Sequence, residues 1–124
     1  MTFTVVVADD DQDIRALVGI ASERAGLRVV ASVGDGASAL AAIRSEQPDL
    51  AILDVTMPEL TGLEVCRQVR ADGVNEDLRI LLLSASVDDA SKQVGFDAGA
   101  DHFLAKPFSP RQLVAWLAVG KEPR

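Results

Sequence analysis

Residues 50–54 read LAILD, a run of four apolar residues that ends in a carboxylate. Four more short runs rich in valine, isoleucine and leucine share its character, and they span residues 3–8, 28–33, 79–83 and 102–105. Most of these runs are apolar at every position rather than at alternate positions, which is typical of strands buried on both faces. The sequence therefore predicts five strands, with LAIL as the third.

Segments with a helical spacing of apolar residues lie between and after these runs. Their predicted buried stripes are Ile14, Leu17, Val18, Ala21 and Ala25; Ala37, Leu40, Ala41 and Ile43; Leu63, Cys66 and Val69; Ala90, Val94 and Ala98; and Leu113, Trp116 and Leu117. Strands that alternate with helices form a parallel sheet with helices on both faces. We therefore expect a doubly wound α/β fold over a single domain, residues 1–124, whose residues after about 119 are frayed or begin a linker.

Composition narrows the class of protein. The chain has 124 residues and a formal net charge of −7, which argues against direct binding of nucleic acid because such binding needs a basic face. A single cysteine excludes an internal disulfide and a cysteine zinc cage. The sequence shows neither a signal peptide nor an apolar run long enough for a membrane helix. The expected location is the cytoplasm, with no membrane partner.

Acidic residues follow two of the predicted strands. Asp9 and Asp10 come directly after the first strand, and Asp54 comes directly after the third. Sites in open parallel sheets form at the carboxyl ends of the strands, so these side chains are expected to share one small region if the two strands are neighbours. Two carboxylates about 5 Å apart repel by about 3 kcal/mol at an effective dielectric near 20. Oxygen ligands at a solvent-facing edge favour a hard divalent cation, with Mg²⁺ the first choice.

Two more polar side chains end strands at the same predicted edge. Lys106 follows the fifth strand, and Ser84 follows the fourth. A metal ion and a lysine neutralise phosphoryl oxygens, while a carboxylate can accept the phosphoryl group covalently. Asp54 is the best acceptor because it stands alone, whereas Asp9 and Asp10 are paired as for metal binding. The predicted chemistry is phosphoryl transfer.

These residues, in this order, resemble the receiver domain of bacterial two-component response regulators. The matching pieces are VVADD at residues 6–10, LD at 53–54 followed by Met57-Pro58 and Gly62, LSA at 83–85, and KPF at 106–108. The resemblance covers essentially the whole chain. It implies a flavodoxin-like fold with five parallel strands in the order 2-1-3-4-5.

The resemblance also implies roles for the acidic residues. Asp54 would accept a phosphoryl group from a phosphohistidine on a sensor histidine kinase or a phosphotransfer protein. Asp10 and Asp54 would ligate Mg²⁺ directly, with the backbone carbonyl of Thr56 as a third protein ligand. Asp9 would contact the ion mainly through water. The domain would thus be a signalling switch that catalyses its own phosphorylation and dephosphorylation rather than chiefly an enzyme.

The remaining roles concern the switch. Lys106 would bind the carboxylate or a phosphoryl oxygen, and the Lys106–Pro107 peptide would be cis. Ser84 would move toward the phosphoryl oxygens, and Phe103 would rotate into the space that this opens. The commonest residues of the family at these two positions are threonine and tyrosine, so the switch here keeps a hydroxyl at 84 and lacks one at 103.

The expected output surface is formed by the fourth helix, the fifth strand and the fifth helix. Phe96 either packs laterally on the fifth strand or is exposed for a partner or a weak homodimer. Related dimers use charged pairs on this face, whereas here Gln112 and Trp116 stand at the corresponding places on the fifth helix. The downstream partner is either a protein effector or an output domain.

Other interpretations remain open at this point. A phosphatase of the haloacid-dehalogenase type also uses an aspartate nucleophile, but it needs a second aspartate two residues later, where this chain has Thr56. Nucleotide binding would require a glycine fingerprint after the first strand, which is absent. A phosphate-independent adaptor would not need the acids. Asp11 and Asp13 are assigned to the cap and first turn of the first helix.

Overall fold

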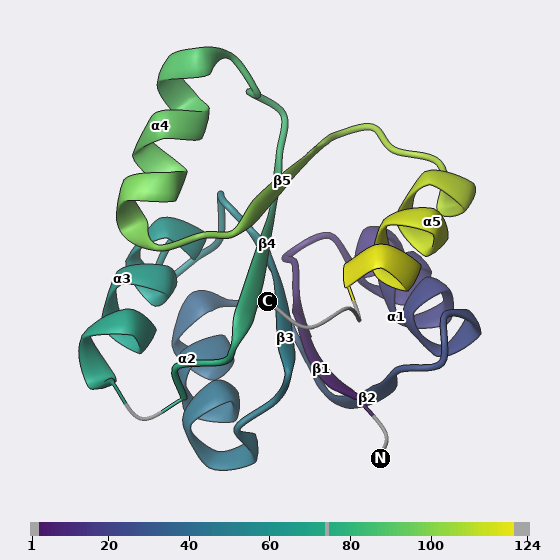
Figure 1. Ribbon diagram of the computed structural model, residues 1–124, viewed down its shortest axis with the longest axis horizontal. Coiled ribbons are helices and arrows are strands. Elements are labelled where there is room, and N and C mark those ends of the chain that lie inside the picture. Colours follow the sequence, from purple (N-terminus) through teal and green to yellow (C-terminus); the bar gives the residue numbers. More distant parts are fainter. Residues whose placement is uncertain (1–2, 74, 121–124) are drawn as a thin grey trace.

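A computed structural model describes residues 3–73 and 75–120. Strands and helices alternate strictly along the chain (Figure 1). In chain order the elements are β1 (Thr4–Ala8), α1 (Gln12–Arg24), β2 (Arg28–Val33), α2 (Gly36–Glu46), β3 (Leu50–Asp54), α3 (Gly62–Asp72), β4 (Arg79–Ser84), α4 (Asp89–Ala98), β5 (His102–Ala105) and α5 (Pro110–Gly120). The strands form one parallel sheet in the order β2-β1-β3-β4-β5, which confirms the predicted doubly wound fold.

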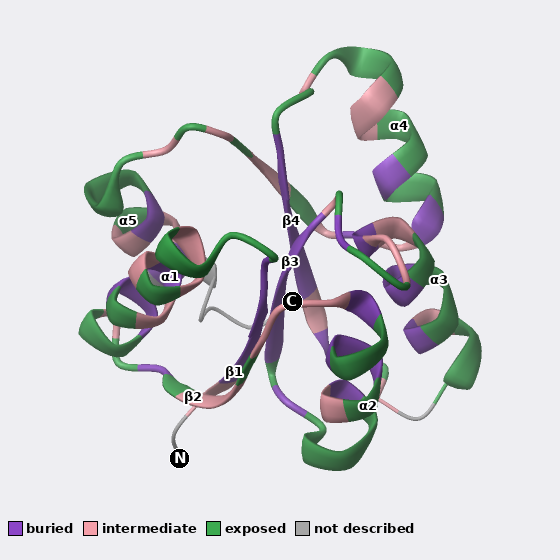
Figure 2. Ribbon diagram, turned by 180° about the vertical axis from the view of Figure 1, so that it is seen from behind, coloured by how far each residue is buried: buried purple, intermediate pink, exposed green. Residues whose placement is uncertain are grey.

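The sheet separates two hydrophobic cores. Helices α1 and α5 pack side by side on one face, while α2, α3 and α4 cover the other (Figure 1). The central strands β1, β3 and β4 are almost entirely buried, whereas the edge strands β2 and β5 are partly exposed (Figure 2). Within the described residues, no helix is both long and apolar enough to span a bilayer. The expected fraying after residue 119 falls mainly on residues 121–124, which lie outside the described residues.

Strands β3 and β4 each extend one residue further than the apolar runs predict. Asp54 is the last residue of β3 and Ser84 is the last residue of β4. Both are paired in the sheet, Asp54 with Leu83 and Ser84 with Ala105. The backbone that carries these two polar side chains is therefore held by the sheet rather than by a loop.

The predicted buried stripe of the fourth helix is wrong at two of its three positions, Ala90 and Val94, and right at Ala98. Ala90 and Val94 of α4 are exposed, and the buried residues are Gly95 and Ala98. Helical periodicity in the sequence is carried by the larger apolar side chains, so a glycine contributes nothing to it. In the folded protein, however, α4 approaches the sheet through its smallest residue.

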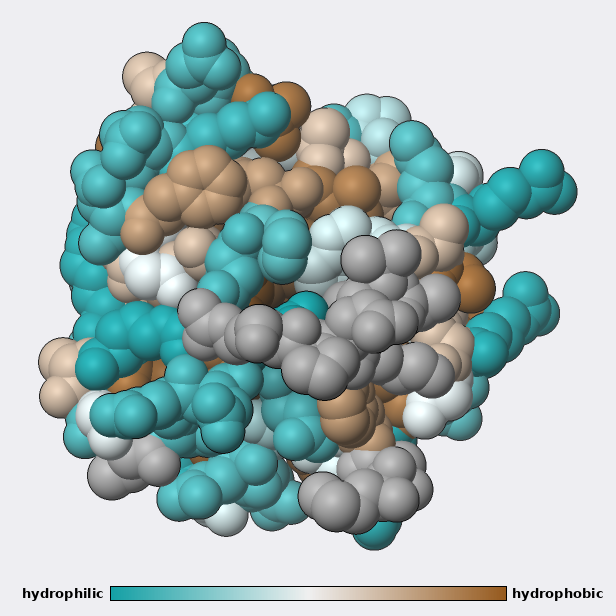
Figure 3. Space-filling model, in the orientation of Figure 1, coloured by the Kyte–Doolittle hydropathy of each residue, from teal (hydrophilic) through white to brown (hydrophobic). Residues whose placement is uncertain are grey.

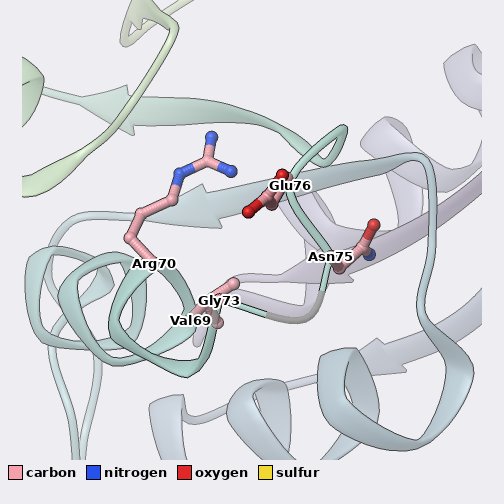
Figure 4. Close-up of a pocket in the computed structure, with 5 residues that line it drawn as sticks. All are labelled: Val69, Arg70, Gly73, Asn75 and Glu76. Atoms are coloured by element: carbon pink, nitrogen blue, oxygen red, sulfur yellow. The ribbon is translucent and has the colours of Figure 1, made fainter.

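A partly buried ion pair ties α3 to the segment between α4 and β5. Arg70 donates to the carbonyl oxygen of Gly99 at 2.9 Å and to Oδ2 of Asp101 at 2.9 Å. The same Oδ2 accepts from the backbone amide of Ile80 at 2.8 Å. Arg70 extends away from α3 beside a hollow of about 270 Å³ at the end of that helix (Figure 4). This contact anchors the C-terminal end of α4 near the amino ends of β4 and β5, whereas the acids lie at the carboxyl ends of the strands.

Replacing Asp101 with alanine is expected to lower the free energy of unfolding by about 1 to 2 kcal/mol, because the amide of Ile80 loses its carboxylate acceptor and Arg70 its partner. Urea denaturation of both proteins measures the difference. The matched control is Asp72→Asn, which breaks the exposed Arg44–Asp72 pair and should have little effect. Equal losses in the two variants would contradict the anchoring role.

Candidate functional site

The predicted polar residues meet at the carboxyl ends of the strands. Strand β1 lies between β2 and β3, and Ala8 pairs with Leu53. Asp9 and Asp54, each the next residue along its strand, are thereby brought to neighbouring positions. Since the chains of parallel strands leave a sheet on the same side, Lys106 after β5 reaches the same edge.

The three acids form one cluster. Asp9, Asp10 and Asp54 each offer a carboxylate oxygen, and these oxygens all lie within 4.8 Å of one another. Asp9 and Asp54 are buried, whereas Asp10 is exposed. Oδ1 of Asp9 accepts from the amide of Asp11 at 2.9 Å, while its buried Oδ2 faces the ammonium of Lys106. A cluster of carboxylates, whose ligand atoms are all oxygen, fits a hard divalent cation.

Lys106 supplies the positive charge of the cluster. Its Nζ lies 2.9 Å from Oδ2 of Asp9 and 3.2 Å from Oδ2 of Asp54. Burial favours the neutral amine, yet the contact with Asp9 and the charges of Asp9 and Asp54 outweigh it and raise the pKa of Lys106 above its ordinary value. The ammonium therefore stays protonated and bridges the two buried carboxylates. The Lys106–Pro107 peptide bond is cis.

Asp54 is the most perturbed of the acids. Burial, followed by the negative charge of Asp9, raises the pKa of Asp54 from 3.8 to about 6. A hydrogen bond from the amide of Thr56 to Oδ1, at 3.2 Å, and the charge of Lys106 oppose this shift only in part. Asp54 is thus a buried carboxylate whose charge is unfavourable in the metal-free protein.

The chain turns back sharply after Asp54. The amide of Gly62 donates to the carbonyl of Val55 at 2.9 Å, and a Cβ at position 62 would collide with the backbone carbonyl of Asp54. Thr61 caps α3 in a reciprocal capping box with Glu64. The loop that carries Thr56 is therefore closed by a glycine that leaves room for the end of β3.

Ser84 is engaged with its own loop. Its hydroxyl donates to the carbonyl of Ser86 at 2.9 Å and accepts from the amide of Ser86 at 3.0 Å. Beside it lies a hollow of about 270 Å³ whose lining includes Thr56, Val94 and Phe103. In this state the hydroxyl is bonded away from the acid cluster.

The aromatic residues of the expected output surface make two edge-on contacts. The rings of Phe96 and Phe103 lie 5.4 Å apart with an interplanar angle of 86°. The rings of His102 and Trp116 lie 5.1 Å apart at 76°. Phe96 is nevertheless 45% exposed, so it combines the lateral contact with an accessible apolar surface.

Arg15 is a member of the site that the sequence reasoning missed. Its Nη1 donates to the backbone carbonyl of Asp9 at 2.9 Å and lies 2.8 Å from the place of a Cβ at Gly34. A cation near the N-terminal end of a helix opposes the helix dipole. A basic residue at this unfavourable position in the sequence therefore indicates that Arg15 has a specific partner.

Comparison with known proteins gives a consistent assignment. Residues 5–118 match the response regulator receiver domain. The transcriptional regulatory protein GltR of Pseudomonas aeruginosa is 42% identical over 112 residues, which cover 90% of this chain and 46% of that protein. The DNA-binding response regulator MtrA of Mycobacterium tuberculosis is 38% identical over 111 residues, which cover 90% of this chain and 47% of that protein. The chain thus spans about half the length of these relatives.

Solved structures agree over nearly the whole chain. The chemotaxis response regulator CheY4 of Vibrio cholerae superposes with a TM-score of 0.89 at 33% identity, covering 97% of this chain and 99% of that one. The beryllofluoride-activated receiver domain of DrrB gives a TM-score of 0.85 at 31% identity, with 97% of each chain covered. The order of the strands, the acids at their ends and these matches point the same way. This chain belongs to the response regulator receiver domain family.

Proposed function

We propose that this domain is a phosphorylation-switched signalling module whose phosphoryl acceptor is Asp54. The donor is a phosphohistidine on a sensor histidine kinase or a phosphotransfer protein. The observation that carries the proposal is the meeting of Asp9, Asp10 and Asp54 with Lys106 at one edge of the sheet, in a chain of this family. Residues 1–124 would form one receiver domain.

Magnesium is the proposed cofactor. Asp10, Asp54 and the backbone carbonyl of Thr56 would hold the ion directly, and Asp9 would hold it mainly through water. When bound, Mg²⁺ neutralises negative charge on the phosphoryl oxygens and on the acids around them. The three converging carboxylates support this assignment, because Mg²⁺ prefers oxygen ligands and the single ammonium of Lys106 balances only part of their negative charge.

The protein's own residues carry the transfer step. A carboxylate oxygen of Asp54 attacks the phosphorus, the bond between phosphorus and the donor's histidine nitrogen breaks, and its electron pair returns to the imidazole. The ammonium of Lys106, already 3.2 Å from Asp54, stays protonated and attracts the transferred oxygens. Burial of Asp54 limits the access of competing water to the acyl phosphate.

The proposed switch begins at Ser84. Its hydroxyl would give up both hydrogen bonds to Ser86 and bond the phosphoryl oxygens, and Phe103 would move into the space vacated. The surface formed by α4, β5 and α5 would then change its affinity for a protein effector or an output domain, by a shift of population between two states. Phe96 and Trp116 are the proposed partner-contact residues of this surface, which also offers a weak homodimer contact.

The domain would bind other proteins, and it would do so in the cytoplasm. The formal net charge of −7 favours protein contacts over direct contact with nucleic acid by this domain. The relative MtrA is a DNA-binding response regulator, and this chain matches 47% of that longer protein. We place the domain in the cytoplasm, where it would meet the cytoplasmic part of a kinase.

The test is phosphorylation by a small donor. With Mg²⁺ and acetyl phosphate, the wild-type protein should gain the mass of one phosphoryl group, and addition of EDTA should prevent the gain. Asp54→Asn should not be labelled, whereas Asp13→Asn, which removes an exposed acid from the first turn of α1, should be labelled normally. Intact-protein mass spectrometry reads all four samples.

Two results would overturn the proposal. One is undiminished labelling of Asp54→Asn, which would place the acceptor elsewhere. The other is steady release of phosphate from an added phosphomonoester, which would favour a phosphatase. Phosphotransfer profiling against the histidine kinases of the same cell would then identify the donor.

A further inference from the structure

Helix α4 contains a glycine on its buried face. Gly95 lies three residues before Ala98, the last residue of α4, and these two are the buried residues of the helix. Glycine in a helix interior is less favourable than alanine. The presence of the less favourable residue at a packed position indicates that a side chain would not fit.

The ring of Phe103 occupies the space that a side chain at position 95 would need. A Cβ at this position would overlap Cζ and Cε2 of Phe103 and would lie 3.2 Å from Cδ1 of Leu82. By contrast, a Cβ on Gly19, also within a helix, would meet nothing within 4 Å. Gly36 and Gly62, the first residues of α2 and α3, would also clash, but mainly with backbone carbonyl groups, whereas the atoms that a Cβ at position 95 would meet belong to side chains.

The ring is held on several sides. Phe96 meets it edge-on, and it also lines the hollow shared with Ser84 and Val94. Apolar surface gathers where α4 approaches β5, while the outer side of α4 is hydrophilic (Figure 3). The ring of Phe103 thus lies between the backbone of Gly95 and a space that it could enter.

We infer that Gly95 is a positioning residue for the switch: its missing side chain forms a seat for the Phe103 ring, and the seated ring sets the distance between α4 and β5. The regulatory part of this inference rests on the proposed function. When the ring leaves the seat, Gly95 has no side chain to fill the gap. Because protein interiors are close-packed, α4 must then move toward the sheet. A rotation of one side chain thereby becomes a displacement of a helix.

The seat is tested by the sign of a stability change. Gly19→Ala should raise the Tm by a few degrees, since alanine is the better helix former. Gly95→Ala should lower the Tm by about 5 °C, because the methyl group displaces the ring. In the Phe103→Ala background, Gly95→Ala should instead raise the Tm. A rise for Gly95→Ala in the wild-type background, or a fall in both backgrounds, would overturn the seat. If Gly95→Ala alone does not fold, failure of the double variant to restore folding overturns it as well.

The regulatory part is tested by amide chemical shifts of α4 and β5 in the absence of any phosphoryl donor. In Gly95→Ala these signals should move in the direction that beryllofluoride and Mg²⁺ produce in the wild type, and in Gly19→Ala they should not. Unchanged signals, or movement in another direction, would refute the coupling. A wild type that does not respond to beryllofluoride would refute both the proposed function and the coupling, while the thermal measurements would still decide the seat.

Discussion

In magnesium-free buffer near neutral pH, Asp54→Asn is expected to be more stable than the wild type by about 2 to 3 kcal/mol. Asparagine is close in shape to the protonated acid, and it removes a carboxylate whose pKa is raised from 3.8 to about 6 by burial and by Asp9. A shift of about two pKa units corresponds to about 3 kcal/mol. For a domain of 124 residues the difference should appear as a rise of about 8 °C in Tm.

The difference should depend on pH with a definite sign. The folded protein binds the Asp54 proton more tightly than the unfolded chain does, because the folded pKa of about 6 exceeds the ordinary value of 3.8. Between these values the folded state keeps a proton that the unfolded state has lost, so stability of the wild type falls as the pH rises. The advantage of Asp54→Asn should therefore be small near pH 4 and complete above about pH 7. A constant difference across this range would contradict the electrostatic cause.

Addition of Mg²⁺ should reduce the difference in stability between Asp54→Asn and the wild type. A cation that binds the folded wild type stabilises it by about 2.7 kcal/mol at one hundred times its dissociation constant. Asp54→Asn lacks one proposed ligand and should gain less. The matched control Asp13→Asn, an exposed acid, should follow the wild type both without and with the ion. Differential scanning calorimetry of the three proteins, each with EDTA and with Mg²⁺, measures the six combinations.

The acid cluster could be predicted from the sequence because its position depends mainly on the order of the strands. Parallel strands in this order bring their carboxyl ends together, so residues 9 and 54, which are 45 positions apart, become neighbours as soon as both runs are recognised as strands. Asp54 lies at the end of a strand whose residues are all buried. The topology therefore places its side chain next to the acids that follow β1.

The packing of α4 could not be predicted in the same way. Hydrophobic periodicity ranks residues by the size of their apolar side chains, and on that scale Val94 exceeds Gly95. The structure reverses the order because the ring of Phe103, from β5, already fills the space beneath the helix. Nor could sequence alone show that Ser84 is bonded to Ser86, since a serine side chain has several accessible rotamers. Both features depend on contacts between side chains rather than on topology.

Replacing Lys106 with methionine is expected to have the opposite effect to Asp54→Asn and to be the larger of the two, with a loss of about 3 to 5 kcal/mol in metal-free buffer. Methionine keeps the length of the apolar stem and removes the ammonium that lies 2.9 Å from Asp9 and 3.2 Å from Asp54. Asp9 is 0% exposed, so its carboxylate would be left buried without a counter-charge.

Three comparisons separate this cause from a loss of packing at Lys106. The loss should shrink at acid pH, because Asp54, whose pKa is raised to about 6, is then protonated and no longer adds its charge to the pair. Asp54→Asn should stabilise the Lys106→Met variant by more than it stabilises the wild type, since the two substitutions alter the same interaction and are not additive. Lys92→Met, on α4 and away from the acids, should leave stability nearly unchanged. Chemical denaturation of the single and double variants measures the free energy of unfolding of each protein. A Lys106→Met protein as stable as the wild type near neutral pH would mean that the two buried carboxylates do not depend on the lysine, because solvent or a proton would then be neutralising them instead.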